Sequence, residues 1–237
     1  MEKQPYPIRI NKYLALQNYA TRVGADELIK KGLVSINGRK AVLGDKVNEG
    51  DEVVVKSKGI HKDFVYYAYN KNTDVSTNPD TTSKDILQVT RFPVRVFPVG
   101  RLDKDSHGLI IMTNDGRVTD RLLSPRFVHE KEYVVKVDKS FSDTFITLMG
   151  NGVHFDGFIS KKCKVFRKPK SKDTFHIVLT EGKKRQIRRM CEALHHNVID
   201  LKRIRIMNVE LGKLPLGEFR EIKGEELNEF LKSLNLK

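Results

Sequence analysis

Cysteine is scarce in this chain, with two in 237 residues, and the scarcity excludes whole classes of protein. Cys163 and Cys191 are too few for a disulfide-rich secreted scaffold or for a zinc site with four cysteine ligands. No apolar run approaches the roughly 18 residues of a membrane-spanning helix, and none follows Met1–Pro5, so we expect neither a membrane span nor a signal peptide. These absences together predict a cytoplasmic protein.

Recognisable loops for nucleotide cofactors are also missing. The sequence has no Gly-x-x-x-x-Gly-Lys phosphate loop, and Gly150-Asn151-Gly152 lacks the third glycine and the strand–helix frame of a dinucleotide site. Asp103 and Asp105 form an Asp-x-Asp pair without other obvious ligands, so a metal is the lesser alternative there. Cys191 and His195 have helical i, i+4 spacing, but zinc needs two further ligands, and a histidine at a helix end is the favoured interpretation. We therefore expect no metal and no cofactor.

Positive charge is what the sequence has in excess, since 44 lysines and arginines against 30 acidic residues give a formal charge of +14. Such a balance favours a polyanionic partner, most often a nucleic acid. Residues 161–205 carry 15 basic and 4 acidic side chains, a net +11 that is most of the whole-chain excess. A solvated basic surface is the alternative. With 39% hydrophobic residues, the chain can still bury a real core.

Residues 1–60 have the pattern of a small separate module. Apolar residues at helical spacing, a capping threonine and a terminating glycine predict two helices, and Asn37-Gly38 is a strong hairpin turn. The expected elements are a helix over 8–16, a helix from Thr21 to before Gly32, and strands over 33–36 and 52–55. The sequence thus predicts a helix–helix–hairpin module.

A short polar segment, Lys56–Gly59, breaks the periodicity and marks the linker. We therefore predict two domains, over residues 1–58 and 62–237. The second has many strand patterns and few helical ones, which is typical of an α+β domain built on a largely antiparallel sheet. Its expected helices cover about 116–123 and 184–194, and its expected strands cover 65–69, 133–137, 165–166, 175–179 and 204–209.

Two stretches of the second domain carry polar side chains of interest. The helix over 184–194 has one apolar stripe, and Arg185, Arg188 and Arg189 lie at its edge or opposite it. Asp103 lies in an irregular segment between two apolar strands, where catalytic groups tend to be presented. Asn114-Asp115-Gly116 is better interpreted as a turn than as a site.

The segment Val99–Gly116 (VGRLDKDSHGLIIMTNDG) closely resembles the signature of the pseudouridine synthases of the small-subunit ribosomal RNA synthase A family. Lys131-Glu132-Tyr133 is similar to the family's Lys-x-Tyr motif, Gly182–Met190 to its third, basic motif, and Leu201-Lys202-Arg203 to a later one. Residues 8–55 resemble the S4 RNA-binding domain that precedes the catalytic domain in this family. Later segments are most similar to the synthase F group, which acts on 23S ribosomal RNA.

This resemblance implies an S4 domain followed by a pseudouridine synthase catalytic domain on a mostly antiparallel sheet. It implies an enzyme that isomerises uridine to pseudouridine in structured RNA, without metal or cofactor. The expected partner is a stem-loop of 23S ribosomal RNA, with a transfer-RNA anticodon as a second one. DNA is not expected, and nothing in the sequence demands more than a monomer.

The resemblance also implies roles for single residues. Asp103 would be the nucleophile, attacking the ribose C1′ or the base C6, since a carboxylate is ionised at neutral pH without activation. A covered carboxylate needs a fixed cation nearby, for which Arg188 is the first candidate and Arg185 the second. Tyr133 would hold the uracil by stacking, with strand packing as the alternative. Further substrate contacts are expected from Arg101, Lys131 and Leu201.

The S4 module would dock RNA through phosphate contacts, which position the protein without reading bases. The residues expected to make them are Arg9, Lys12, Arg22, Lys30, Lys31 and Lys40. One loop departs from the family pattern, because Asn72 and Asp74 replace its usual proline and glycine. The loop is far from Asp103 in sequence, so we expect the departure to affect substrate fit rather than chemistry.

Two other functions compete with the enzyme. A non-catalytic S4-type RNA-binding or ribosome-associated protein would use the same basic surfaces and leave Asp103 dispensable. An S4-bearing RNA methyltransferase would need a glycine-rich cofactor loop after a strand, and the sequence has none.

Overall fold

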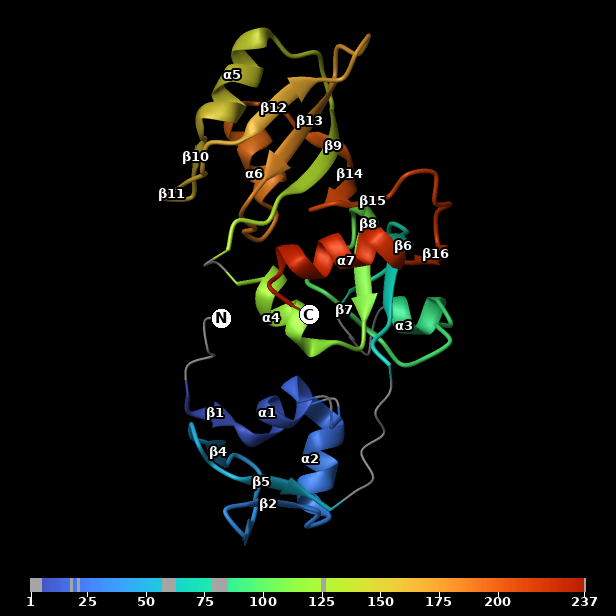
Figure 1. Ribbon diagram of the computed structural model, residues 1–237. Helices are drawn as coiled ribbons and strands as arrows, with labels where there is room; N and C mark the ends of the chain where they lie inside the picture. The colour runs from blue at the N-terminus through green and yellow to red at the C-terminus, as the bar shows by residue number, and fades with distance from the viewer. Residues whose placement is uncertain are drawn as a thin grey trace.

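The chain folds into a small N-terminal domain and a larger domain that contains one long sheet (Figure 1). The computed structural model describes residues 6–17, 19–20, 22–56, 63–77, 85–124 and 127–236. No helix formed by these residues is long and apolar enough to cross a membrane.

The N-terminal domain packs two helices against short strands. Helices α1 (Ile10–Leu16) and α2 (Arg22–Lys30) bury Leu14, Ala25 and Ile29 in the core of this domain. The strands β1 (Ile8–Arg9), β2 (Val34–Ile36), β3 (Arg39–Lys40), β4 (Lys46–Val47) and β5 (Val53–Val55) pair as β1–β4 and β3–β2–β5. The expected helix–helix–hairpin module is therefore confirmed, while its expected cap, Thr21, lies outside the described residues.

The larger domain is built on a nine-stranded sheet whose main path runs β12-β13-β9-β14-β8-β6-β16, with β15 paired to β14 and β7 to β8. Only β14 and β8 are parallel among its strand pairs formed by described residues. The α+β fold with a mostly antiparallel sheet is confirmed. Its strands are β6 (Tyr66–Lys71), β7 (Phe97–Pro98), β8 (His107–Thr113), β9 (Lys131–Val137), β12 (Lys164–Arg167), β13 (Thr174–Leu179), β14 (Val198–Ile206), β15 (Val209–Glu210) and β16 (Phe219–Glu221).

Each half of this sheet has its own core. Helices α5 (Asp143–Asn151) and α6 (Gln186–Ala193) pack on the half that contains β13 and β9, around Phe145, Phe175 and Met190. Helices α4 (Gly116–Leu122) and α7 (Gly224–Ser233) pack on the half that contains β8 and β6, around Ile111 and Phe230. A short helix, α3 (Ile86–Val89), and a hairpin of β10 (His154–Phe155) and β11 (Phe158–Ile159) complete the domain.

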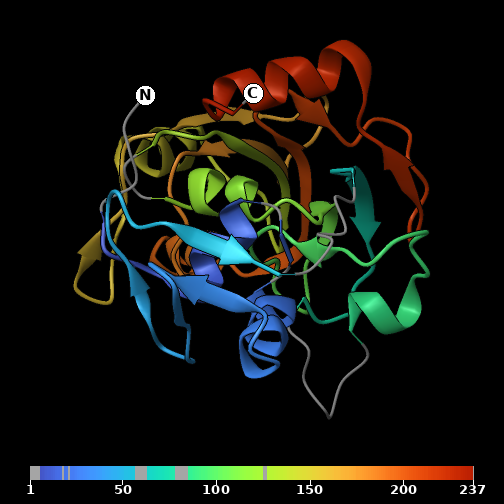
Figure 2. The ribbon, with the colours of Figure 1, turned by 60° about the horizontal axis from the view of Figure 1, so that its bottom comes forward.

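The two domains touch through helices α1 and α4. Figure 2 brings the N-terminal domain, in blue, to the front of the larger domain. The expected linker at Lys56–Gly59 lies largely outside the described residues, so the domain limits 1–58 and 62–237 stay predictions.

Several features of the larger domain differ from the expectations. The strand expected over 204–209 begins at Val198 and stops at Ile206, because Met207 takes a left-handed φ of 53° and turns the chain into β15. Helices α3, α5 and α7 are not among the expected elements. Asp115 does more than form a turn, since its buried carboxylate caps α4 and accepts a hydrogen bond from the Tyr66 hydroxyl at 2.8 Å.

Candidate active site

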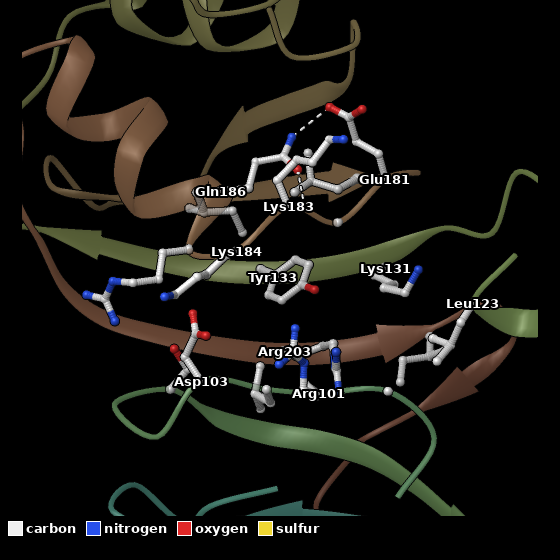
Figure 3. Close-up of a pocket in the computed structure, with 18 of the residues that line it drawn as sticks. Arg101, Asp103, Leu123, Lys131, Tyr133, Glu181, Lys183, Lys184, Gln186 and Arg203 are labelled. Carbon is white, nitrogen blue, oxygen red and sulfur yellow. Dashed lines mark hydrogen bonds between the residues drawn. The ribbon is translucent and has the colours of Figure 1, made fainter. Parts of the chain in front are cut away.

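A pocket of about 810 Å³ opens above the central strands β9 and β14 (Figure 3). Its walls are the loops over 99–106 and 179–187, together with side chains that follow α4. A volume of this size is within the range of pockets that bind small ligands.

Asp103 lies half-buried in the pocket wall, on the loop between β7 and β8. The backbone N–H of Ser106 donates to the Asp103 carbonyl oxygen at 3.0 Å, and the Thr77 hydroxyl donates to the Leu102 carbonyl oxygen at 3.4 Å. The main chain on both sides of Asp103 is therefore held in place. The irregular segment between two strands expected from the sequence is what the structure contains.

Gly108 allows this loop to approach strand β14. It has a φ of +104°, and a Cβ at this position would collide with the carbonyl oxygen of Arg203 and lie 2.8 Å from its nitrogen. Only glycine accommodates both the conformation and the close approach. The parallel pairing of Gly108 with Arg203 thus ties the Asp103 loop to the pocket floor.

The floor itself is one face of the antiparallel pair β9–β14. Tyr133 lies opposite Arg203 in the register of this pair. Alternate residues of a strand share a face, so Lys131 joins Tyr133 and Leu201 joins Arg203 on the pocket side. Arg101 is exposed at the pocket wall. The structure therefore brings most of the expected site residues together, namely Asp103, Tyr133, Lys131, Leu201, Arg101 and Arg185.

Arg188 lies elsewhere than expected. It is 7% exposed, and its guanidinium donates to the carbonyl oxygens of Val198 and Asp105, both at 3.0 Å. Its Nε lies 3.3 Å from the Asp105 carboxylate, and Arg185 donates to the same carboxylate at 2.9 Å. Because α6 places both arginines over Asp105, their ion-pair partner is Asp105 and not Asp103, which corrects the expected pairing.

Lys71 is a buried cation near the Asp103 loop that the sequence motifs did not indicate. It is fully buried at the end of β6, where its Nζ donates to the carbonyl oxygens of Asn72 and Val75 at 2.7 and 2.8 Å. Burial and then the charge of Arg203 lower the pKa of Lys71 to about 8, while Asp105 and Asp103 act in the opposite direction. The one signal in the sequence was a lysine at the end of an apolar strand.

Arg203 is the second buried cation that was not selected. It is 3% exposed, and its Nε donates to the Leu109 carbonyl oxygen at 2.6 Å. Burial and then the charge of Arg203 lower the pKa of Lys131 to about 8. The pocket therefore combines the carboxylates of Asp103 and Glu181, the ring of Tyr133 and several cations. Within the described part of the chain, no group of three or more histidine, cysteine, aspartate or glutamate side chains could hold a metal ion.

Comparison with known proteins identifies the family to which a chain with this pocket belongs. The family profile for RNA pseudouridylate synthases matches residues 54–193, and the profile for S4 domains matches residues 8–53. The chain belongs to the RNA pseudouridylate synthase family. The synthase is 44% identical to the dual-specificity RNA pseudouridine synthase RluF of Escherichia coli O6:H1, over 95% of this chain and 79% of that protein.

Two further relatives agree with this assignment. The ribosomal large subunit pseudouridine synthase B of Bacillus subtilis is 34% identical over 92% of this chain and 93% of that protein. A crystal structure of a pseudouridylate synthase aligns with a TM-score of 0.70 at 26% identity, covering 95% of this chain and 99% of that one. The family resemblance and the enzyme class expected from the sequence are confirmed. Neither the non-catalytic protein nor the methyltransferase is favoured.

The residues expected to bind RNA divide into two groups in the synthase. Four of them are exposed on the N-terminal domain, namely Arg9, Lys30, Lys31 and Lys40. Lys12 and Arg22 instead lie against the larger domain, where Asp120 of α4 is 3.1 Å from the Lys12 Nζ and 3.5 Å from the Arg22 Nη2. Both side chains thus form ion pairs with Asp120 across the two domains, and their role in binding RNA stays a prediction.

The loop that departs from the family pattern lies next to the Asp103 loop. Asp74 has a left-handed φ of 63°, a conformation that the family's usual glycine adopts without strain. Its backbone N–H donates to the carbonyl oxygen of Lys104 at 2.8 Å. Distance in sequence was therefore a poor guide, because a change in this loop bears directly on the residue beside Asp103.

Proposed function

We propose that this synthase modifies a uridine in a stem-loop of 23S ribosomal RNA and a second uridine in a transfer-RNA anticodon. Its similarity to a dual-specificity RNA pseudouridine synthase and to a ribosomal large subunit synthase supports these substrates. The formal charge of +14 supports a large RNA partner, since basic side chains bind the phosphate backbone. Under this proposal the synthase acts as a monomer in the cytoplasm.

Asp103 is the nucleophile of the proposed reaction. The target uridine is first extruded from the RNA, at a cost of a few kcal/mol, and enters the pocket. The carboxylate attacks C1′ or C6, the N1–C1′ bond breaks, the base turns, and C5 bonds to C1′. The observation that carries the proposal is that Asp103 and Tyr133 face one pocket of about 810 Å³.

The other residues of the pocket hold the base and its backbone. Tyr133 offers a ring on which uracil can stack, an interaction worth about 1–3 kcal/mol, and its hydroxyl can help move the C5 proton. Leu201, which is 5% exposed, packs against the base. Arg101 binds a phosphate or fills the space that the extruded base leaves.

Arg188 acts on Asp103 indirectly in this proposal. It donates to the Asp105 carbonyl oxygen at 3.0 Å and to the Ser106 hydroxyl at 3.3 Å, so it fixes the loop directly after Asp103. Arg185 holds the same loop by donating a hydrogen bond to the Asp105 carboxylate. We assign both arginines to positioning the loop, and Lys71 to placing a positive charge near the Asp103 carboxylate.

Tritium release from RNA labelled at uracil C5 tests the proposed substrates, because isomerisation replaces the C5–H bond with a C5–C1′ bond. We expect the wild type to release tritium from 23S ribosomal RNA fragments and from transfer RNA. Asp103→Asn should bind both RNAs and release none. Asp143→Asn, which changes a carboxylate that is 97% exposed on α5, is the matched control and should behave as the wild type. RNA binding by the wild type without tritium release would overturn the proposal.

A further inference from the structure

Arg203 and Lys131, on the floor of the pocket, have no acidic partner in the part of the chain that the structure describes. Arg203 is 3% exposed, and its buried Nη2 atom has no hydrogen-bond partner among those residues. The bond from its Nε to Leu109 keeps the guanidinium in a fixed orientation. Among the described residues, the hydrogen-bond partner of the Lys131 Nζ is the carbonyl oxygen of His129, at a long 3.5 Å.

Several other arginines of the same domain are paired with acids. Arg205, which follows shortly after on β14, lies 3.0 Å from both Glu130 and Glu132. Arg189 lies 2.7 Å from Asp156. A buried guanidinium without such a partner costs free energy, and a second cation beside it adds repulsion. The entry of an anion would relieve both effects.

The unpaired cations lie where the base is expected to sit. Arg203 is directly opposite Tyr133 in the strand register, and Lys131 is on the same face of β9. In the view of Figure 3, Tyr133 and Arg203 lie between Asp103 and Lys131. A uracil stacked on Tyr133 would therefore have the nucleophile on one side, Lys131 on the other, and Arg203 beside the ring.

We propose that Arg203 and Lys131 bind the uracil oxygens O2 and O4 and stabilise the negative charge that the base carries during the reaction. This inference rests on the proposed function. When N1–C1′ breaks, its electron pair stays on the uracil, where N1, O2 and O4 share the charge, and a carboxylate oxygen of Asp103 bonds to C1′. On rejoining, an electron pair of the uracil forms C5–C1′, the carboxylate leaves, C5 loses its proton and N1 gains one.

Attack at C6 also places negative charge on the base, which again needs to be stabilised. The carboxylate oxygen then bonds to C6, and the C5=C6 electron pair moves onto O4. In both routes negative charge reaches a carbonyl oxygen of the base, and fixed donors aimed at such an oxygen accelerate a reaction more than they strengthen ground-state binding. The test must therefore separate the rate of the bound complex from RNA affinity.

Single-turnover tritium release with saturating enzyme makes that separation. We expect Arg203→Met and Lys131→Met to lower this rate about 100- to 1,000-fold, while the RNA dissociation constant changes less than about threefold. Lys202→Met is the matched control, because its side chain is on the opposite face of β14 and the substitution removes the same charge. If the cations bound phosphate instead, affinity and its salt dependence would fall and the saturated rate would stay, which would overturn the proposal.

A second measurement covers the case in which Arg203→Met fails to fold. The rate of Lys131→Arg, divided by the wild-type rate at the same pH, should rise between about pH 8 and pH 10. The reason is that burial and Arg203 lower the pKa of Lys131 to about 8, whereas arginine keeps its charge. Lys71, His129 and Tyr133 are present in both proteins, so their effects on the rate cancel in this ratio. A ratio independent of pH, or a full rate for Lys131→Met, would overturn the inference, whereas a wild type inactive on every RNA would instead reject the proposed function.

Discussion

Gly108 and Arg203 lie backbone to backbone in the parallel pair β8–β14, too close for Gly108 to carry a side chain. Gly108 follows shortly after Asp103, on the strand that the Asp103 loop enters. Arg203 lies on the pocket floor opposite Tyr133. A contact that only glycine permits therefore sets the position of the proposed nucleophile relative to the face that holds the base.

Gly108→Ala should disrupt this contact. The added Cβ would collide with the Arg203 backbone at a φ of +104°, so we expect a loss of about 2–4 kcal/mol in the free energy of unfolding, measured by urea denaturation. Gly116→Ala is the control, because a Cβ there meets nothing within 4 Å and Gly116 begins helix α4. Equal stability of the two variants would contradict the account of β8–β14.

Replacing Lys71 should change how stability depends on pH. Burial lowers the pKa of Lys71 from 10.5 to about 8, so between these values the unfolded chain binds more protons than the folded one. The contribution of Lys71 therefore raises the free energy of unfolding as pH increases through this window, by at most about 1.4 kcal/mol per pH unit. In Lys71→Met this increase in the free energy of unfolding with pH should be absent.

The comparison of Lys71→Met with the wild type must be made at each pH, because other groups titrate in the same range. Lys131 has a pKa near 8 as well, and burial raises the pKa of Cys163 to about 11, which lowers stability above the ordinary thiol value. These contributions are common to both proteins. Urea denaturation from pH 7 to 10 should thus give curves that diverge, and parallel curves would rule out the buried charge of Lys71. Lys213→Met, at an exposed lysine, is the control.

Elements with strong local signals were predictable from the sequence. The hairpin turn at Asn37-Gly38 and the end of α2 at Gly32 are confirmed, since all three residues take the left-handed backbone that such positions need. The apolar stripe of α6 was also visible. Helix α5 also has a capping signal in the sequence, Ser142, whose side chain accepts a hydrogen bond from the Phe145 N–H.

The contacts of the site were less predictable, because they depend on the order of the strands. Lys71 is near Asp103 only because β6 pairs with β8. Arg203 enters the site because β14 lies between β8 and β9. The spacing of Arg185 and Arg188 along α6 gave their face of the helix but not their partner, Asp105. Local patterns therefore predicted several members of the site, whereas Lys71, Arg203 and the partner of the two arginines follow from the strand order and the packing of α6.

Reversing the charge of Lys30 and Lys31 should weaken RNA binding. Both are exposed on the N-terminal domain at the end of α2, away from the pocket lining. We expect Lys30→Glu with Lys31→Glu to lower affinity and to reduce the salt dependence of binding, while the single-turnover rate at saturation stays near the wild-type value. Anisotropy titrations at several salt concentrations measure this. Lys213→Glu with Lys232→Glu is a charge-matched control, and unchanged affinity in the first variant would contradict the docking role.

Asp120→Asn should release Lys12 and Arg22 from the interdomain ion pair. Exposed pairs contribute about 0.2–1 kcal/mol each, so removing the competing carboxylate should raise RNA affinity by about two- to fivefold at low salt. Asp143→Asn, which removes an exposed carboxylate paired with Arg167, should leave affinity nearly unchanged. Weaker RNA binding by Asp120→Asn would show that the ion pair supports docking rather than competing with it.

The most direct test of the central claim compares two carboxylates on one loop. Asp103 faces the pocket, whereas Asp105 is engaged with Arg185 and Arg188. With tritium-labelled RNA and saturating enzyme, we expect Asp103→Asn to lower the single-turnover rate at least about 10,000-fold. Asp105→Asn should lower it only about 10- to 100-fold, because it loosens the loop without removing the nucleophile. Activity retained by Asp103→Asn and lost in Asp105→Asn would contradict the account.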